Sequence, residues 1–265
     1  MSEDRIAAWL EALDRRHLAE LTSSEVARAL RALSSAYVER RDRLQRGAAL
    51  DSAGKRAAFA LFYAPLHFLV TQAIVAALPP LARRPREVLD VGCGTGSAGA
   101  AWAIHAGTAT IRGLDRHPWA IAEATWTYRQ LGLPGRASQR DAARTPLRAG
   151  AGTAVLVAYA ANELQDAGRA SLLEALIAAH AAGAAVLIIE PIARRATPWW
   201  PHWSARFAAS GGRADEWRFP STLPVGQQSL AHSNSGAVSG GASSATTVGW
   251  KLLMASRTAA AKTGE

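Results

Sequence analysis

Two periodicities of apolar residues divide the sequence into a helical part and an alternating part. Over residues 3–20, apolar side chains recur every three or four positions, with Arg and Glu opposite them, which predicts an amphipathic helix. Capping-box spacing at 22–25 predicts a second helix to about residue 46. A third helical stretch covers roughly 55–78 and ends at two prolines. We therefore expect residues 1–82 to form an N-terminal helical region.

From residue 83 onward, short apolar runs alternate with helical patterns. The predicted helices cover 118–131 and 167–181, and the predicted strands cover 86–91, 110–115, 136–140, 154–159 and 184–189. Strands that alternate with helices build a parallel sheet with helices on its faces. Residues 83–256 are thus predicted to form one α/β domain with a mostly parallel sheet.

The C-terminal part has a weaker pattern. Residues 216–219 and 249–255 predict two short strands, and Ser, Gly, Ala and Thr dominate residues 233–249, which is typical of a flexible loop. Because residues 221–247 show little strand pattern, a degraded or unusual hairpin is the expectation there. Residues 257–265 are expected to form a flexible tail.

One apolar stretch needs a membrane test. Residues 57–82 carry no charged side chain, but Pro65 would interrupt a spanning helix. We therefore expect a buried helix pair and no membrane contact. The first residues lack the apolar core of a signal peptide, which leads us to expect a cytoplasmic protein.

Composition and charge leave two interpretations open. A hydrophobic fraction of 49% and a charged fraction of 19% fit a globular chain and exclude a disordered one. The net charge of +9 comes almost entirely from arginine. This surplus favours a polyanionic partner such as RNA, or it reflects a GC-rich genome. The only cysteine is Cys93, which excludes a disulfide or a cysteine-based metal site, and no metal site is predicted.

The strongest chemical signal is a glycine-rich turn after the first predicted strand. Glycines at 92, 94 and 96 allow positive φ and close approach of a ligand to the backbone. With Gly99 and Asp115, the same segment also satisfies the dinucleotide fingerprint. Asp90, two residues before the first glycine, is not required by that fingerprint. A carboxylate there suits a cationic sulfonium ligand that carries an amino group.

This segment resembles motif I of class I S-adenosylmethionine-dependent methyltransferases, which have a Rossmann-like fold. The resemblance implies that Asp90, Gly92, Gly94 and Gly96 bind S-adenosylmethionine. It also implies that Asp115, at the end of the second strand, binds the ribose hydroxyls, for which a carboxylate is suited because it accepts from both. Each acid has a second interpretation, since Asp90 could cap the turn and Asp115 could be a surface acid.

The same resemblance extends past the third and fourth strands. It implies that Asp141 and Ala142 contact adenine, although Asp141 could instead cap a helix. Asn162 and Glu163 follow the fourth strand, at the usual substrate side, and are the candidates for orienting the methyl acceptor. Glu163 could also be a helix-start acid.

Outside motif I, the chain resembles the small-ribosomal-subunit methyltransferase-like family. Residues 30–195 share its helical start, a Glu-Leu pair at 163–164 and a Glu-Pro pair at 190–191. The resemblance implies rRNA or a ribosomal component as substrate. The chain departs from that family in lacking the cysteines that are associated with an iron–sulfur cluster. Trp199, Trp200 and Trp203 could stack bases beside Arg194, Arg195 and Arg206, or pack a helix with Phe207, and we favour packing.

Four functions follow from these observations. The first is methylation of RNA or a ribosomal component, and the second is methylation of a small molecule. The third is a non-catalytic, cofactor-binding ribosome assembly factor, and the least favoured is an NAD-dependent oxidoreductase. The sequence determines neither the acceptor atom nor the oligomeric state.

Overall fold

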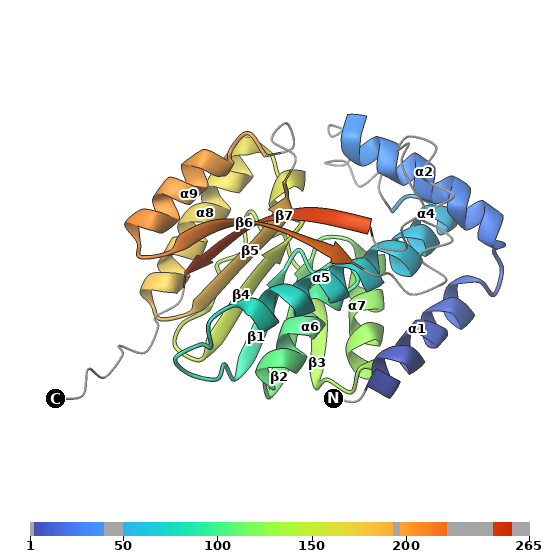
Figure 1. Cartoon of the computed structure of the whole chain (residues 1–265), viewed down its shortest axis with the longest axis horizontal. Coiled ribbons are helices and arrows are strands. Elements are labelled where there is room, and N and C mark those ends of the chain that lie inside the picture. The colour runs from blue at the N-terminus through green and yellow to red at the C-terminus, as the bar shows by residue number, and fades with distance from the viewer. Residues whose placement is uncertain (1–2, 40–49, 193–196, 222–245, 256–265) are drawn as a thin grey trace.

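The computed structural model describes residues 3–39, 50–192, 197–221 and 246–255. The N-terminal helices are α1 (Glu3–His17), α2 (Ser23–Glu39), α4 (Ala53–Ala58), the π-helical turn η1 (Phe59–Tyr63) and α5 (Ala64–Ala77). The expectation of a helix pair around Pro65 is wrong, because α4, η1 and α5 form one uninterrupted helix (Figure 1). Proline has no N–H that could donate to the usual i−4 carbonyl. A wider π turn precedes Pro65, in which Ala64 N–H donates to Phe59 O, and it accommodates the missing hydrogen bond without ending the helix.

This continuous helix, Ala53–Ala77, is long and apolar enough to cross a membrane. Its apolar surface packs inside the protein, since 61% of an 18-residue apolar window of this helix is buried. Phe68, Val70 and Ile74 are fully buried in the same core as the strands. The core packing therefore accounts for its hydropathy.

The α/β domain follows the predicted alternation. Its helices are α6 (Ser97–Ala106), α7 (Pro118–Gln130), the short 3₁₀ turn η2 (Ala161–Glu163), α8 (Asp166–Ala181) and α9 (Trp200–Ala209). Its strands are β1 (Glu87–Val91), β2 (Thr110–Asp115), β3 (Gly135–Gln139), β4 (Thr153–Ala158), β5 (Ala185–Pro191), β6 (Arg213–Ser221) and β7 (Thr246–Ala255). Each of the five predicted strands is confirmed within two residues at either end.

The strands form one seven-stranded sheet in the order β3-β2-β1-β4-β5-β7-β6. Strands β1 to β5 are parallel, and β7 pairs antiparallel with both β5 and β6. The predicted strands at 216–219 and 249–255 were too short, because β6 and β7 form a regular ladder from Arg213↔Met254 to Ser221↔Thr246. The degraded hairpin expected over 221–247 falls almost entirely outside the described residues. Of the loop expected over 233–249, residues 246–249 belong to β7, and the rest lies outside the described residues, as does the predicted tail.

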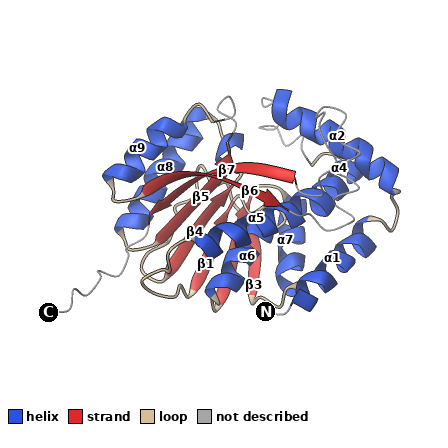
Figure 2. Ribbon diagram, in the orientation of Figure 1, coloured by secondary structure: helices blue, strands red, loops and turns tan. Residues whose placement is uncertain are grey.

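Helices cover both faces of the sheet (Figure 2). Alternating strand residues pack into two cores, one on each face. Val88, Ile111 and Leu156 pack with α1, α5, α6 and α7, whereas Leu89, Val155 and Ile188 pack with α8 and α9. The chain crosses from one side of β1 to the other between β3 and β4. The carboxyl ends of β1 and β4 therefore meet at the topological switch point, where open α/β sheets bind ligands.

Candidate functional site

The glycine turn after β1 lies at this switch point. Gly92, Gly94 and Gly96 have φ angles of 73°, 52° and 74°, so the predicted left-handed conformation is confirmed. A Cβ on Gly92 would lie 2.4 Å from Ala160 Cβ, and one on Gly96 would lie 2.6 Å from the Tyr128 ring. The turn is therefore held tightly between the end of β4 and helix α7, and its backbone is left without side chains of its own at these positions.

Asp115 joins the end of β2 to this turn. Its Oδ2 accepts a hydrogen bond from Gly94 N–H at 3.0 Å, and its Oδ1 accepts from His117 N–H at 2.8 Å. A carboxylate oxygen has two lone pairs, so each oxygen can accept a further hydrogen bond. Neighbouring ribose hydroxyls are donors of the kind that this carboxylate can hold. Asp115 is thus placed beside the glycine backbone, as the sequence predicts.

Asp90 lies beneath the turn. It is 1% exposed, and its Oδ2 accepts from the N–H of Gly99 in the first turn of α6, at 3.1 Å. Gly99 is required there, since a Cβ would lie 2.4 Å from that oxygen. Burial, with a smaller contribution from Asp115, raises the pKa of Asp90 to about 7. This is the capping arrangement weighed above, and a direct contact with the cofactor stays a prediction.

Cys93 occupies the turn as a buried side chain. Burial, together with the charges of Asp90 and Asp115, raises the pKa of its thiol well above the usual value. A thiol that stays protonated is a poor nucleophile, so Cys93 has a packing role in the turn.

Asp141 and Ala142 follow β3. The Asp141 carboxylate is exposed, accepts from Ala143 N–H at 2.9 Å and lies 3.7 Å from Arg144 Nε. These contacts fit the capping interpretation of Asp141. Ala142 packs against the core on the α8–α9 side. Their contact with adenine stays a prediction.

Asn162 is the centre of a buried polar network at the ends of β4 and β5. Its Nδ2 donates to Glu190 Oε2 at 2.6 Å, and its Oδ1 accepts from Trp199 Nε1 at 3.1 Å. Glu190 is 0% exposed and also accepts from the backbone N–H groups of Ala161, at 3.0 Å, and Asn162, at 3.3 Å. Burial is the main reason that the pKa of Glu190 rises to about 8.

Glu163 lies beside this network. Its carboxylate is partly exposed, pairs with Arg116 at 3.9 Å, and raises the pKa of Glu190 through its charge. The two residues that the sequence offers together as substrate-side candidates thus differ in their partners, since Asn162 hydrogen-bonds Glu190 and Glu163 pairs with Arg116. It adds Glu190 to Asn162, although the sequence singled out the Glu-Pro pair only as a family feature.

An aromatic row borders the same edge of the sheet and was missed in the sequence. We define it as Phe59, Tyr63, His67 and Tyr159. Ring centroids are 5.5 Å apart for Phe59 and Tyr63, 5.7 Å for Tyr63 and His67, and 3.8 Å for the stacked His67 and Tyr159. The Phe59 ring lies 3.5 Å from where a Cβ on Gly94 would stand. The spacing of 59, 63 and 67 on one helical face could have indicated the row.

Tyr159 reaches the row through an unusual backbone conformation. Its φ of 62° makes it the one non-glycine residue with positive φ in the described part of the chain. A bulky residue in this region is strained, and such strain is frequent at functional sites. The positive φ of Tyr159 changes the direction of the chain after β4. Tyr159 then packs on His67, and the side chain of Asn162 hydrogen-bonds Glu190.

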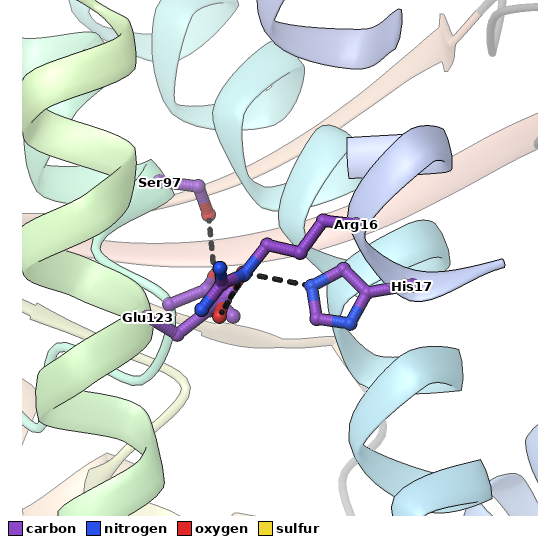
Figure 3. A network of polar contacts seen from close by, with 5 residues as sticks. Arg16, His17, Ser97 and Glu123 are labelled. Carbon is purple, nitrogen blue, oxygen red and sulfur yellow. Dashed lines mark hydrogen bonds and ion pairs between the residues drawn. The ribbon is translucent and has the colours of Figure 1, made fainter. Parts of the chain in front are cut away.

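Helix α1 packs on the α/β domain through a second polar cluster (Figure 3). Glu123 of α7 is 0% exposed, and its carboxylate lies 3.1 Å from Arg16 Nε and 2.8 Å from His17 Nε2. The guanidinium of Arg16 also lies 5.0 Å from the centre of the Trp126 ring. Helix α1 is therefore held against α7, the helix that follows β2, by these contacts.

The tryptophan cluster after β5 is mainly a packing element. Trp200 and Trp203 are 6% and 2% exposed and lie in the core with Phe207, which fits the favoured interpretation. Arg206 pairs with Glu174 at 2.7 Å. Arg194 and Arg195 lie outside the described residues.

The sequence from 88 to 183 matches the family profile of a methyltransferase domain. The chain is an S-adenosylmethionine-dependent methyltransferase. This match decides between the two cofactors that the glycine turn allows, and S-adenosylmethionine is the cofactor of the enzyme. No curated protein matches the sequence. The comparisons give no support to an affiliation with the ribosomal family, which stays a prediction.

The methyltransferase is similar to several solved structures. The methyltransferase domain of bacterial-CtHen1-C has a TM-score of 0.50 and 12% identity, covering 72% of this chain and 98% of that one. The TehB-like SAM-dependent methyltransferase from Corynebacterium glutamicum has a TM-score of 0.45 and 17% identity, covering 71% and 87%. A SAM-dependent methyltransferase from Aquifex aeolicus has a TM-score of 0.47 and 15% identity, covering 72% and 93%. At this identity the first structure supports a shared fold only.

Proposed function

We propose that the enzyme transfers a methyl group to a planar heteroaromatic acceptor bound along the aromatic row. When bound, S-adenosylmethionine supplies a methyl group on an already activated sulfonium. The residues present fit this cofactor, because the glycine turn offers bare backbone and Asp115 offers acceptors for hydroxyls. What remains for the protein is to hold the acceptor close, aligned and away from water.

The aromatic row is the observation that carries this proposal. It begins with Phe59 against Gly94, where the cofactor is expected, and ends with Tyr159 beside the Asn162 network. Ring faces favour stacking with flat ligands. His67 contributes as an uncharged ring, since burial lowers its pKa to about 3. Asn162 supplies the polar contact that the sequence assigned to substrate orientation.

The acceptor that the structure favours is a small molecule. The helix that carries Phe59 and His67 packs against the glycine turn through Phe59 and against Tyr159 through His67. A site bordered in this way suits a ligand that is enclosed on several sides. We place the reaction in the cytoplasm and away from membranes as part of the same proposal.

A base within rRNA is the second candidate acceptor. The net charge of +9 favours a polyanionic partner, and aromatic rings also stack on unpaired bases. Binding to RNA releases counterions and therefore weakens steeply as salt rises. Affinity for a small uncharged acceptor does not change in this way.

The test is transfer of tritiated methyl groups from labelled S-adenosylmethionine to three sets of acceptors. These are planar heterocycles (nicotinamide, quinoline and adenine), aliphatic acceptors (glycine and guanidinoacetate) and small ribosomal subunits. We expect label on a planar heterocycle, and about a tenfold loss in Phe59→Ala, which removes one ring of the row. Label on the subunits alone, falling with salt, would establish the RNA candidate. Label on aliphatic acceptors alone, unaffected by Phe59→Ala, would refute the proposal.

A further inference from the structure

We propose that Glu190 is a positioning residue that holds the side-chain amide of Asn162 in one orientation for the acceptor. The inference rests on the proposed function and names the recognition chemistry of the same site. Glu190 ends β5 and Asn162 lies in the turn after β4, so the two neighbouring strands together set the position of one amide.

The two partners of Asn162 fix which way its amide points. Trp199 Nε1–H can only donate, so the atom that it meets must be the amide oxygen. A carboxylate accepts, so the atom that meets Glu190 must be the amide nitrogen. An amide flip would place donor against donor and acceptor against acceptor. The orientation therefore follows from chemistry and does not depend on how the amide was assigned.

Glu190 also fixes the backbone that carries Asn162. Its Oε1 accepts from Ala161 and Asn162 N–H, while Oε2 accepts from the Asn162 side chain. One fully buried carboxylate thus holds both the start of η2 and the side chain that η2 presents. Arg169 adds support from α8, since its Nε donates to Ala161 O at 3.1 Å.

The network leaves Asn162 with part of its hydrogen-bonding capacity. A primary amide has two N–H donors and two acceptor lone pairs, and one of each is used by Glu190 and Trp199. One N–H and one lone pair remain for a ligand. The acceptor class that matches them is a planar ring with a donor beside an acceptor on its edge, as in a lactam or a ring carboxamide.

The charge on Glu190 makes the affinity for the acceptor depend on pH. The N–H donors around it match the ionised carboxylate, so the orientation of Asn162 is held best above the pKa of Glu190, which is about 8. Among the charged groups around Glu190, Glu163 raises its pKa and Arg169 lowers it. Glu190 in turn raises the pKa of Tyr159, and Lys251 is its register partner on β7. Affinity for an acceptor of this class should therefore increase from about pH 6 to about pH 9.

The experiment measures binding of probe rings by saturation-transfer NMR, with S-adenosylhomocysteine bound to the full chain. The probes are nicotinamide and 2-pyridone, each compared with a partner that lacks the edge donor, methyl nicotinate and N-methyl-2-pyridone. Wild type, Glu190→Gln and Asn162→Leu are compared at about pH 6 and about pH 9. Glu174→Gln, an acid-to-amide change on the surface pair with Arg206, is the matched control.

We expect the donor-bearing probes to bind wild type about tenfold more tightly than their partners, and this preference to be lost in Glu190→Gln and Asn162→Leu. Affinity for S-adenosylhomocysteine should stay within about twofold, and the pH dependence should disappear in both Glu190→Gln and Asn162→Leu but persist in Glu174→Gln. An unchanged preference and pH profile in Glu190→Gln would overturn the inference. If no planar probe binds any variant while S-adenosylhomocysteine does, the proposed function fails instead.

Discussion

Replacing Asp115 by Asn tests how the enzyme holds its cofactor. The substitution keeps the size of the side chain but exchanges one carboxylate oxygen for an NH2 group. In the wild-type protein, both Asp115 oxygens accept hydrogen bonds from backbone N–H groups, of Gly94 at 3.0 Å and of His117 at 2.8 Å. In the variant, the NH2 group must face one of these donors, and that side can no longer accept a ribose hydroxyl.

The magnitude follows from the type of bond that is lost. A hydrogen bond to a charged group contributes about 1.5–3 kcal/mol. At about 1.4 kcal/mol for each factor of ten, the loss of one such bond weakens cofactor affinity by about 10–150-fold. The backbone hydrogen bond that is lost where the NH2 group faces a donor also lowers the free energy of unfolding, by about 1–3 kcal/mol.

Isothermal titration with S-adenosylhomocysteine and urea denaturation measure the two effects separately. Glu174→Gln, which alters an exposed ion pair with Arg206, is the control and should change neither. An Asp115→Asn variant that binds S-adenosylhomocysteine within about twofold of wild type would show that the carboxylate does not contact the cofactor.

Three further predictions concern the parts of the fold that support the site. Gly92→Ala should lower the free energy of unfolding by about 2–5 kcal/mol, because alanine would have to adopt a positive φ and its Cβ would overlap with Ala160 Cβ. An unchanged melting temperature would contradict this. Glu123→Gln should cost about 1–3 kcal/mol in urea denaturation by weakening the contacts of α1, and a loss no larger than in Glu174→Gln would refute it. Burial raises the folded-state pKa of Asp90 to about 7, so the folded state binds this proton more tightly than the unfolded state does. The contribution of Asp90 to the free energy of unfolding therefore falls as pH rises from about 4 to about 7. Asp90→Asn should flatten that decline, and a plot of unfolding free energy against pH with the same slope as wild type would argue against it.

The sequence predicted the sheet well because its strands are short, apolar and separated by clear helical patterns. The positions of β1, β4 and β5 follow from burial on both faces, which makes them short runs dominated by Val, Leu, Ile and Ala. The C-terminal strands were predicted too short, since their pairing is antiparallel and non-local, and Asp215 and Pro220, which lie in the missed parts of β6, have little strand preference by themselves.

The cofactor side of the site could also be predicted, because its function is encoded in consecutive residues. Gly92 to Gly96 and Asp115 belong to one βαβ unit, and local spacing is enough to bring them together. The acceptor side could not be predicted in the same way. Glu190 and Phe59 come from β5 and from a helix far upstream, and only the fold brings them near Asn162 and Gly94. The π turn before Pro65 has no periodicity of its own that would have revealed it.

The most direct test of the central claim is isothermal titration of the wild-type chain with S-adenosylhomocysteine, and in parallel with NAD. We predict one S-adenosylhomocysteine bound per chain, no heat of binding with NAD, and no displacement of the first ligand by the second. Binding of NAD, or no binding of S-adenosylhomocysteine by the folded chain, would contradict the assignment of the glycine turn as the site of S-adenosylmethionine.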